Sequence, residues 1–213
     1  MTSGTEEEQL AQIKEWWQRN GMPLLTGAAL ALALVFGWQF WQKHQINQTH
    51  EASAIYQQLL TAALTDGQPD TAEVSRLGQR LKKDFAGTHY AQYGSLFVAK
   101  VAVESGRLDE AAAELQGVLD KPADKVLEEL ARQRLARVLS AQDKTEAALA
   151  LLDGEALEAY AASREELRGD LLVKLERLDE AHAAYTKAKE SLSQDAAIGG
   201  LQLKLDDLAR GEA

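Results

Sequence analysis

Three stretches decide the fold: VAVESGRLDEAAAELQGVL (residues 101–119), ARVLSAQDKTEAALALL (136–152) and LLVKLERLDEAHAAYTKA (171–188). Each reads as a helix, a short polar turn, a Glu-Ala pair and a second helix. The alanines of these pairs, Ala111, Ala147 and Ala181, lie 36 and 34 residues apart. A regular period of this length predicts stacked helix pairs, because a single pair cannot bury its apolar face alone.

The alanines have a packing role in this interpretation. Each lies near the start of a second helix, where a larger side chain would hold the two crossing helices apart. A two-helix unit of 34 residues is typical of the tetratricopeptide repeat. The last repeat fits that pattern best, because Gly169, Tyr185 and Ala188 stand at its small and aromatic positions relative to Ala181. In the middle repeat Leu135 replaces the expected glycine, so that match is partial.

The flanking segments extend the same architecture. Residues 52–85 predict a divergent first helix pair without the Glu-Ala signature, and Ser163 with Glu166 predicts a capping box at the start of the last pair. A terminal capping helix is expected after Gln194, with apolar positions Ile198, Leu201, Leu205 and Leu208. Since prolines are few and no strand-like alternation occurs, the sequence predicts an all-α solenoid of three to four helix pairs plus this helix over residues 42–213.

A second decisive feature is MPLLTGAALALALVFGWQFW at residues 22–41, which carries no charge. Twenty helical residues span about 30 Å, the thickness of the hydrocarbon core of a bilayer. Tryptophans flank the stretch at both ends, as in the aromatic belts that hold a helix at the two membrane interfaces. They are Trp16, Trp17, Trp38 and Trp41. The sequence therefore predicts a leader at residues 1–21 followed by one transmembrane helix at 22–41, with the lipid bilayer as a partner.

A cleaved signal peptide is the rival interpretation of this stretch. It would require small residues at a cleavage site directly after the apolar run. The run ends instead in bulky residues, Gly-Trp-Gln-Phe-Trp-Gln-Lys, and the leader is acidic at Glu6, Glu7 and Glu8. These features favour an uncleaved anchor.

Charge and residue size give two further expectations for the anchor. Lys14 and Arg19 precede the span and Lys43 follows it, so the positive-inside rule favours a cytoplasmic N-terminus and an exported C-terminal domain by a small margin. Small residues recur every four positions on one face of the span, which allows a second membrane helix to approach closely. This face consists of Ala29, Ala33 and Gly37.

Composition excludes several classes of function. The net charge is −10, and an acidic chain repels phosphate backbones, so nucleic acid is not expected as a partner. There is no cysteine, and the four histidines form no metal-binding spacing. No phosphate-binding loop or nucleophile elbow is present. We therefore expect a protein that is not an enzyme and needs no cofactor or metal, with a docking surface in the groove of its repeats.

The combination of anchor and repeats resembles the YfgM family of bacterial inner-membrane proteins. The closest local features are WWQRNGMPLLTGAALALALVFGWQFWQ at residues 16–42 and SREELRGDLLVKLERLDEAHAAYTKA at 163–188. The resemblance implies an ancillary subunit of the SecYEG translocon whose repeat domain faces the periplasm. It further implies cooperation with the membrane-anchored chaperone PpiD in handing exported polypeptides to periplasmic chaperones. It transfers no contact residue, because the family has no catalytic motif.

A second interpretation remains open from the residues themselves. A repeat domain on the cytoplasmic side of the membrane would act as a scaffold or regulator that recruits a soluble signalling partner. The two interpretations differ in the orientation of the anchor, which the charges around residues 22–41 favour by a small margin for the exported domain.

Overall fold

The structure is a computed structural model that describes residues 3–64, 69–192 and 199–211. The chain divides into two compact units, Met1–His50 and Glu51–Ala213. The repeat unit thus begins at Glu51, after a polar and mostly exposed stretch at residues 42–50 that has no apolar face to pack.

Helix α1 spans Ser3–Ala63 and contains Pro23; its residues up to His50 belong to the N-terminal unit and its last turns to the second unit. The Thr26 hydroxyl, one turn later, donates to the carbonyl oxygens of Met22 and Pro23 at 2.9 Å each. Within the described residues, α1 is the one helix long and apolar enough to cross a membrane. Its apolar side chains up to Ile46 are almost all exposed, unlike those of a helix at the core of a globular domain.

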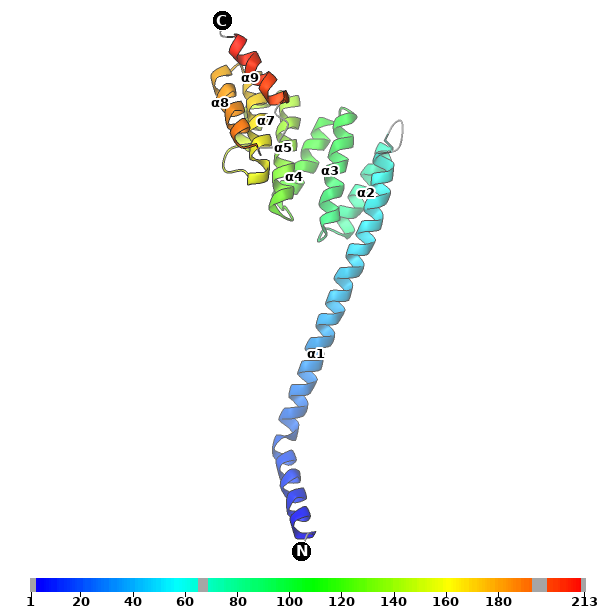
Figure 1. Ribbon diagram of the computed structural model, residues 1–213. Helices are drawn as coiled ribbons and strands as arrows, with labels where there is room; N and C mark the ends of the chain where they lie inside the picture. Colours follow the sequence, from blue (N-terminus) through cyan, green and yellow to red (C-terminus); the bar gives the residue numbers. More distant parts are fainter. Residues whose placement is uncertain (1–2, 65–68, 193–198, 212–213) are drawn as a thin grey trace. The chain divides into compact units, whose positions relative to one another are not determined.

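The second unit is a stack of antiparallel helix pairs, and no strand occurs among the described residues (Figure 1). The end of α1 pairs with α2, and the pairs α3–α4, α5–α6 and α7–α8 follow, with α9 packed on α8. The predicted all-α solenoid with a terminal helix is confirmed. The bounds are α2 Thr71–Asp84, α3 His89–Glu104, α4 Leu108–Asp120, α5 Lys125–Ala141, α6 Thr145–Leu151, a 3-10 turn Glu158–Tyr160, α7 Ala161–Lys174, α8 Leu178–Glu190 and α9 Gly199–Gly211.

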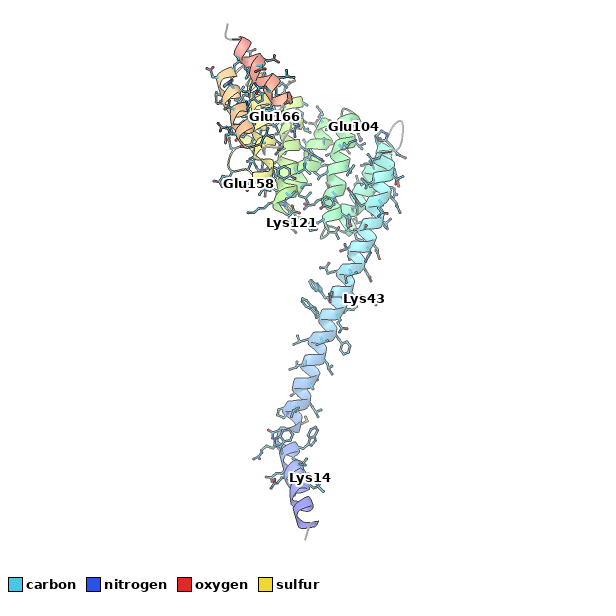
Figure 2. The ribbon with its side chains drawn as sticks, in the orientation of Figure 1. Lys14, Lys43, Glu104, Lys121, Glu158 and Glu166 are labelled. Atoms are coloured by element: carbon cyan, nitrogen blue, oxygen red, sulfur yellow. The ribbon has the colours of Figure 1, made fainter. Side chains whose placement is uncertain are left out.

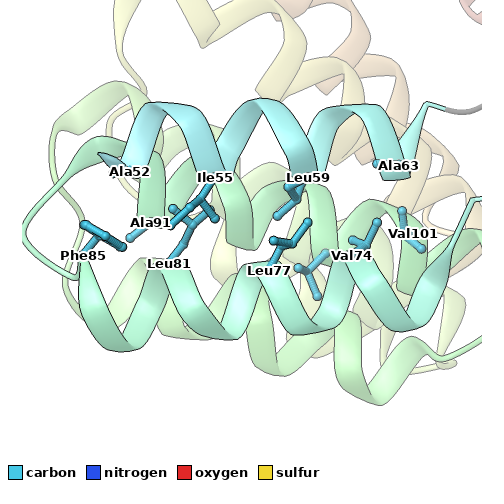
Figure 3. Close-up of a cluster of buried hydrophobic side chains, with 11 residues drawn as sticks. Ala52, Ile55, Leu59, Ala63, Val74, Leu77, Leu81, Phe85, Ala91 and Val101 are labelled. Atoms are coloured by element: carbon cyan, nitrogen blue, oxygen red, sulfur yellow. The ribbon is translucent and has the colours of Figure 1, made fainter. Parts of the chain in front are cut away.

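The apolar core is divided into four clusters along the stack. The first joins α1, α2 and α3, and Figure 3 shows Leu59, Leu77 and Leu81 interdigitating at its centre. The second joins α3, α4 and α5, the third joins α5 to α8, and the fourth joins α8 to α9. Each helix pair therefore shares its apolar stripe with the next, as expected for a solenoid.

Three turns fix the register of the repeats. Gly106, Asp143 and Glu176 each adopt a left-handed conformation, with φ of 74°, 61° and 60°, between the two helices of a pair. In each turn the next residue donates its N–H to a carbonyl five residues earlier, which is the closing bond of a Schellman motif. The three bonds are Arg107 N to Ala102 O (2.8 Å), Lys144 N to Leu139 O (2.9 Å) and Arg177 N to Leu172 O (2.9 Å).

The turns correct the predicted register of the middle repeat. Ala111 and Ala181 lie fully buried five residues after their left-handed residues, and the equivalent position in the middle repeat is Ala148, which is also fully buried. Ala147 is exposed, so its assignment to helix packing was wrong by one residue. The position of the expected glycine shifts by one residue as well, from Leu135 to Ala136 on α5, which is fully buried.

The ends of the last pair differ from the sequence prediction in one respect. Helix α7 begins at Ala161, directly after the 3-10 turn, so Ser163 lies inside the helix and donates its hydroxyl to Tyr160 O at 3.1 Å. The predicted capping box is therefore wrong. Leu201 and Leu205 of α9 are buried, whereas Gln194 and Ile198 lie outside the described residues.

Candidate docking site

The first helices of two neighbouring pairs, α3 and α5, border an open cavity of about 340 Å³ above α4. Its floor is apolar, and its rim carries the charged ends of four long side chains. The lining residues are Leu96, Ala99, Lys100, Val103, Glu104, Leu108, Leu115, Arg134, Arg137, Val138 and Ala141. A mostly apolar concavity with a few convergent polar groups is the usual form of a binding site.

The charges on the rim are unequally satisfied. Lys100 Nζ lies 2.6 Å from Glu104 Oε1, so this pair is neutral as a unit. Arg134 has no hydrogen-bond or ion-pair partner among the described residues, and Arg137 reaches only the backbone oxygen of Gln133, at 3.5 Å. Burial and then the neighbouring Arg137 charge lower the pKa of Arg134, which nevertheless stays protonated because a guanidinium titrates far above neutral pH. The cavity therefore presents two unneutralised positive charges.

An aromatic cluster adjoins the cavity on the same helix. Tyr56 of α1 lies with its ring centroid 5.5 Å from Tyr90, 6.0 Å from Tyr93 and 6.0 Å from Phe97, all on α3. Burial, followed by the neighbouring tyrosines, raises the pKa of Tyr56, so this hydroxyl is uncharged at neutral pH. Tyr93 remains exposed, and exposed aromatic side chains of this kind are enriched at protein interfaces.

A buried ion pair joins α5 to α7. The Arg164 guanidinium binds the Glu129 carboxylate with two hydrogen bonds, one of them 2.9 Å long, and both side chains are 5% exposed. Arg164 also donates to Gly154 O at 3.2 Å, and Gln133 links Glu129 to Ser163 at 2.9 and 3.1 Å. Burial alone would raise the pKa of Glu129, but the bonds from Arg164 and Gln133 outweigh it and lower that pKa. The pair therefore fixes α5, which carries Arg134 and Arg137.

The last pair contains the small and aromatic residues singled out in the sequence. Tyr185 is buried with its ring directly on Gly169, where a Cβ would collide with it, and its hydroxyl donates to Asp170 Oδ1 at 2.9 Å. Lys204 Nζ of α9 lies 5.5 Å from the centroid of the same ring. Ala188 is fully buried.

The anchor residues lie on α1, whose flanking charges Lys14 and Lys43 are labelled in Figure 2. Trp16, Trp17, Trp38 and Trp41 are 50–63% exposed, and the rings of Trp38 and Trp41 lie 5.2 Å apart. The small residues Ala29, Ala33 and Gly37 are exposed along the span. Their contacts with lipid and with a second membrane helix stay predictions.

The acidic and histidine side chains in the described part of the chain are not gathered into a metal site. No group of three or more His, Asp or Glu side chains there is placed to hold a metal ion. The features of the candidate site that the sequence analysis missed are Arg134, Arg137 and the Tyr56 cluster. The sequence did contain a signal for the two arginines. They lie three residues apart on a helix whose apolar residues face the core.

The fold defines a class of protein, a helical repeat protein with one helix able to cross a membrane. Residues 14–210 match the tetratricopeptide repeat-like domain family. The chain is 31% identical to the ancillary SecYEG translocon subunit of Haemophilus influenzae over 89% of this chain and 91% of that protein. It is 30% identical to those of Escherichia coli, over 96% and 97% of the two chains, and Neisseria gonorrhoeae, over 95% and 97%. The chain belongs to the family of ancillary SecYEG translocon subunits.

Proposed function

We propose that the chain is a non-enzymatic ancillary subunit of the SecYEG translocon, held in the bacterial inner membrane by residues 22–41. The observation that carries the proposal is the extent of the likeness, because it spans both the apolar helix and the repeats of the relatives that bear this name. A likeness confined to the repeats would support a generic scaffold equally well.

In this proposal residues 1–21 are cytoplasmic and residues 42–213 lie in the periplasm. Lys14 and Arg19 before the span, against Lys43 after it, support this orientation through the positive-inside rule. The repeat domain would dock emerging exported polypeptides and the membrane-anchored chaperone PpiD, and would assist the transfer of substrates to periplasmic chaperones. The stacked helix pairs and the cavity between α3 and α5 supply a surface suited to such docking.

A pair of reporter fusions tests the orientation. Alkaline phosphatase fused after Ala213 is expected to be active, because the enzyme matures only outside the cytoplasm, and a green fluorescent protein at the same position is expected to be dark. The reverse pattern would exclude the periplasmic role and favour the cytoplasm-facing scaffold.

Co-purification with SecYEG from detergent-solubilised membranes tests the assembly itself. If the small face of the span contacts a translocon helix, Ala33→Leu should reduce the recovered SecYEG, because the larger side chain keeps the helices apart. Ala31→Leu, on another face of the same helix, is the matched control. Failure of the unaltered chain to recover SecYEG would refute the proposal.

A further inference from the structure

The cavity between α3 and α5 is basic, whereas the domain around it is acidic. Beyond Lys43 the sequence contains 29 acidic and 20 basic residues. The cavity nevertheless carries three basic side chains and one carboxylate, Glu104, which Lys100 neutralises. A positive site on an otherwise acidic surface attracts anionic groups selectively, because the surrounding carboxylates repel them elsewhere.

The two arginines at the rim are held in an unfavourable arrangement that an anion would relieve. Arg134 and Arg137 lie three residues apart on α5, where like charges on a helix face repel each other. Most other arginines of the repeats have a carboxylate within ion-pair distance, among them Arg76 with Glu73, Arg132 with Glu128 and Arg177 with Glu180. The charge that is missing beside Arg134 and Arg137 is therefore a carboxylate or a similar anion.

The floor of the cavity adds an apolar requirement. An engineered cavity of about 150 Å³ already admits benzene, so a space of about 340 Å³ takes a leucine or phenylalanine side chain with room for its neighbours. Val103 is 42% exposed at the wall of the cavity, and the exposed Tyr93 lies on the same helix. A simple inorganic anion would leave this apolar surface uncovered.

We propose that this cavity binds an acidic segment of a partner protein, with one large apolar side chain inserted between α3 and α5 and flanking carboxylates paired with Arg134 and Arg137. The inference rests on the proposed function, since it specifies the chemistry of the partner that the repeat domain docks. Planar guanidinium groups suit this role because they bind carboxylates through two parallel hydrogen bonds.

Peptide binding to the full-length protein in phosphatidylcholine nanodiscs tests the site. The probe is a fluorescein-labelled peptide of sequence GDELFEDG, and its binding is followed by fluorescence anisotropy at low and high salt. The comparison peptides are GNQLFQNG, which replaces carboxylates by amides, and GDESSEDG, which removes the apolar pair. The acidic apolar peptide is expected to bind about tenfold more tightly than either, and the advantage over the amide peptide should fall with salt.

Substitutions at the rim locate the binding. Arg134→Gln with Arg137→Gln should weaken binding of the probe by about tenfold, because two charge-assisted bonds are lost. The matched control is Arg76→Gln with Arg80→Gln on α2, which changes the net charge equally and should leave binding unaltered. Arg137→Gln alone is a variant at an exposed side chain, so its effect on binding is separable from any effect on packing.

The apolar half of the site is tested separately. Val103→Ser should weaken binding several-fold through lost apolar contact, at roughly 25 cal/mol per Å² of apolar surface left uncovered. Val126→Ser, at a similarly exposed valine of α5 outside the cavity, should not change it.

The outcomes separate this inference from the proposed function. If the amide peptide binds as tightly as the acidic one, or the α2 control weakens binding as much as the rim variant, the inference is overturned while the reporter and SecYEG results stand on their own. If light scattering shows a stable dimer that the rim substitutions dissociate, a second copy occupies the cavity and the inference is likewise overturned. If the probe binds as expected but SecYEG is not recovered, the proposed function fails and the site remains.

Discussion

The middle and last helix pairs solve the same packing problem by different means. In the last pair, Gly169 lets the Tyr185 ring lie directly against α7. In the middle pair, α6 has seven residues, and the connection that follows it is held from outside by Arg164, which bonds Gly154 O and Glu129. Both pairs therefore pack a small residue at the helix crossing, Ala148 and Ala181, but the middle pair depends in addition on a buried charge from its neighbour.

This difference explains why the last repeat was easier to recognise in the sequence than the middle repeat. Close packing within a pair needs small and aromatic residues at fixed spacing, which is what a repeat consensus records. A buried ion pair between α5 and α7 joins residues 35 positions apart and leaves no local pattern. In the corrected register the middle repeat keeps small residues at Ala136 and Ala148 but has Leu152 at the position of Tyr185, so it departs from the consensus without losing its fold.

The largest expected effect comes from breaking the buried ion pair. Glu129→Ala leaves the Arg164 guanidinium buried without a counter-charge, which should destabilise the repeat domain by about 3–5 kcal/mol. Thermal unfolding followed by circular dichroism of the full chain in detergent measures the change. Glu128→Ala is the matched control, since Glu128 pairs with Arg132 at a solvent-accessible position and should cost less than about 1 kcal/mol.

The register of the middle repeat is tested by two neighbouring alanines. Ala148→Leu adds a branched side chain at a fully buried helix crossing and should destabilise the domain by about 1–3 kcal/mol. Ala147→Leu, one residue earlier and exposed, should change stability by less than about 0.5 kcal/mol. Equal melting temperatures for the two variants would contradict the corrected register.

Two glycines in different helices should respond with opposite sign. Gly169→Ala gains helix propensity of about 1 kcal/mol, but its methyl group collides with the Tyr185 ring, so a net loss of about 1 kcal/mol is expected. Gly117→Ala, in α4 with no atom within 4 Å of the added Cβ, should stabilise by up to about 1 kcal/mol. Stabilisation by both substitutions would show that Tyr185 is not packed on Gly169 as described.

The smallest effect on stability is expected when the pH is lowered. Because the pKa of Glu129 is lowered in the folded chain, the contribution of its ionised form is complete above the unfolded pKa of about 4.3 and is lost as pH falls towards the folded value. The difference in melting temperature between the unaltered chain and Glu129→Gln should therefore begin to shrink as pH falls below about 4.3. A constant difference between the two from neutral pH to pH 3 would show that the ionised carboxylate is not what stabilises the pair.

Much of the fold was predictable because local sequence patterns determine it. The apolar stretch at residues 22–41 and the recurring helix–turn–helix segments gave the all-α class, the order of the helices and the terminal helix. The error at Ala147 arose because two alanines follow Glu146, so the Glu-Ala pair alone does not fix the register of the middle repeat. The position of the left-handed residue Asp143, five residues before Ala148, fixes the register instead. An aspartate adopts this conformation less often than glycine, so the sequence does not mark the turn clearly.

The candidate site was less predictable. The cavity brings together side chains from α3, α4 and α5, and the absence of a carboxylate beside Arg134 and Arg137 is a property of their neighbours in space. The sequence shows both arginines but does not show which acidic residues lie within reach of them. Family resemblance gave the translocon association, yet it could not name a contact residue.

The division of the core into four clusters has a consequence for how the domain opens. The last cluster is the smallest, with Tyr185, Ala188, Leu201 and Leu205 at its centre, and it is bordered by one neighbouring cluster. In a linear stack, opening this end breaks one interface, whereas opening the centre breaks two. Amide hydrogen exchange should therefore be fastest in α9 and slowest in α3 to α5, so that the chain unzips from its C-terminal end while the cavity stays formed.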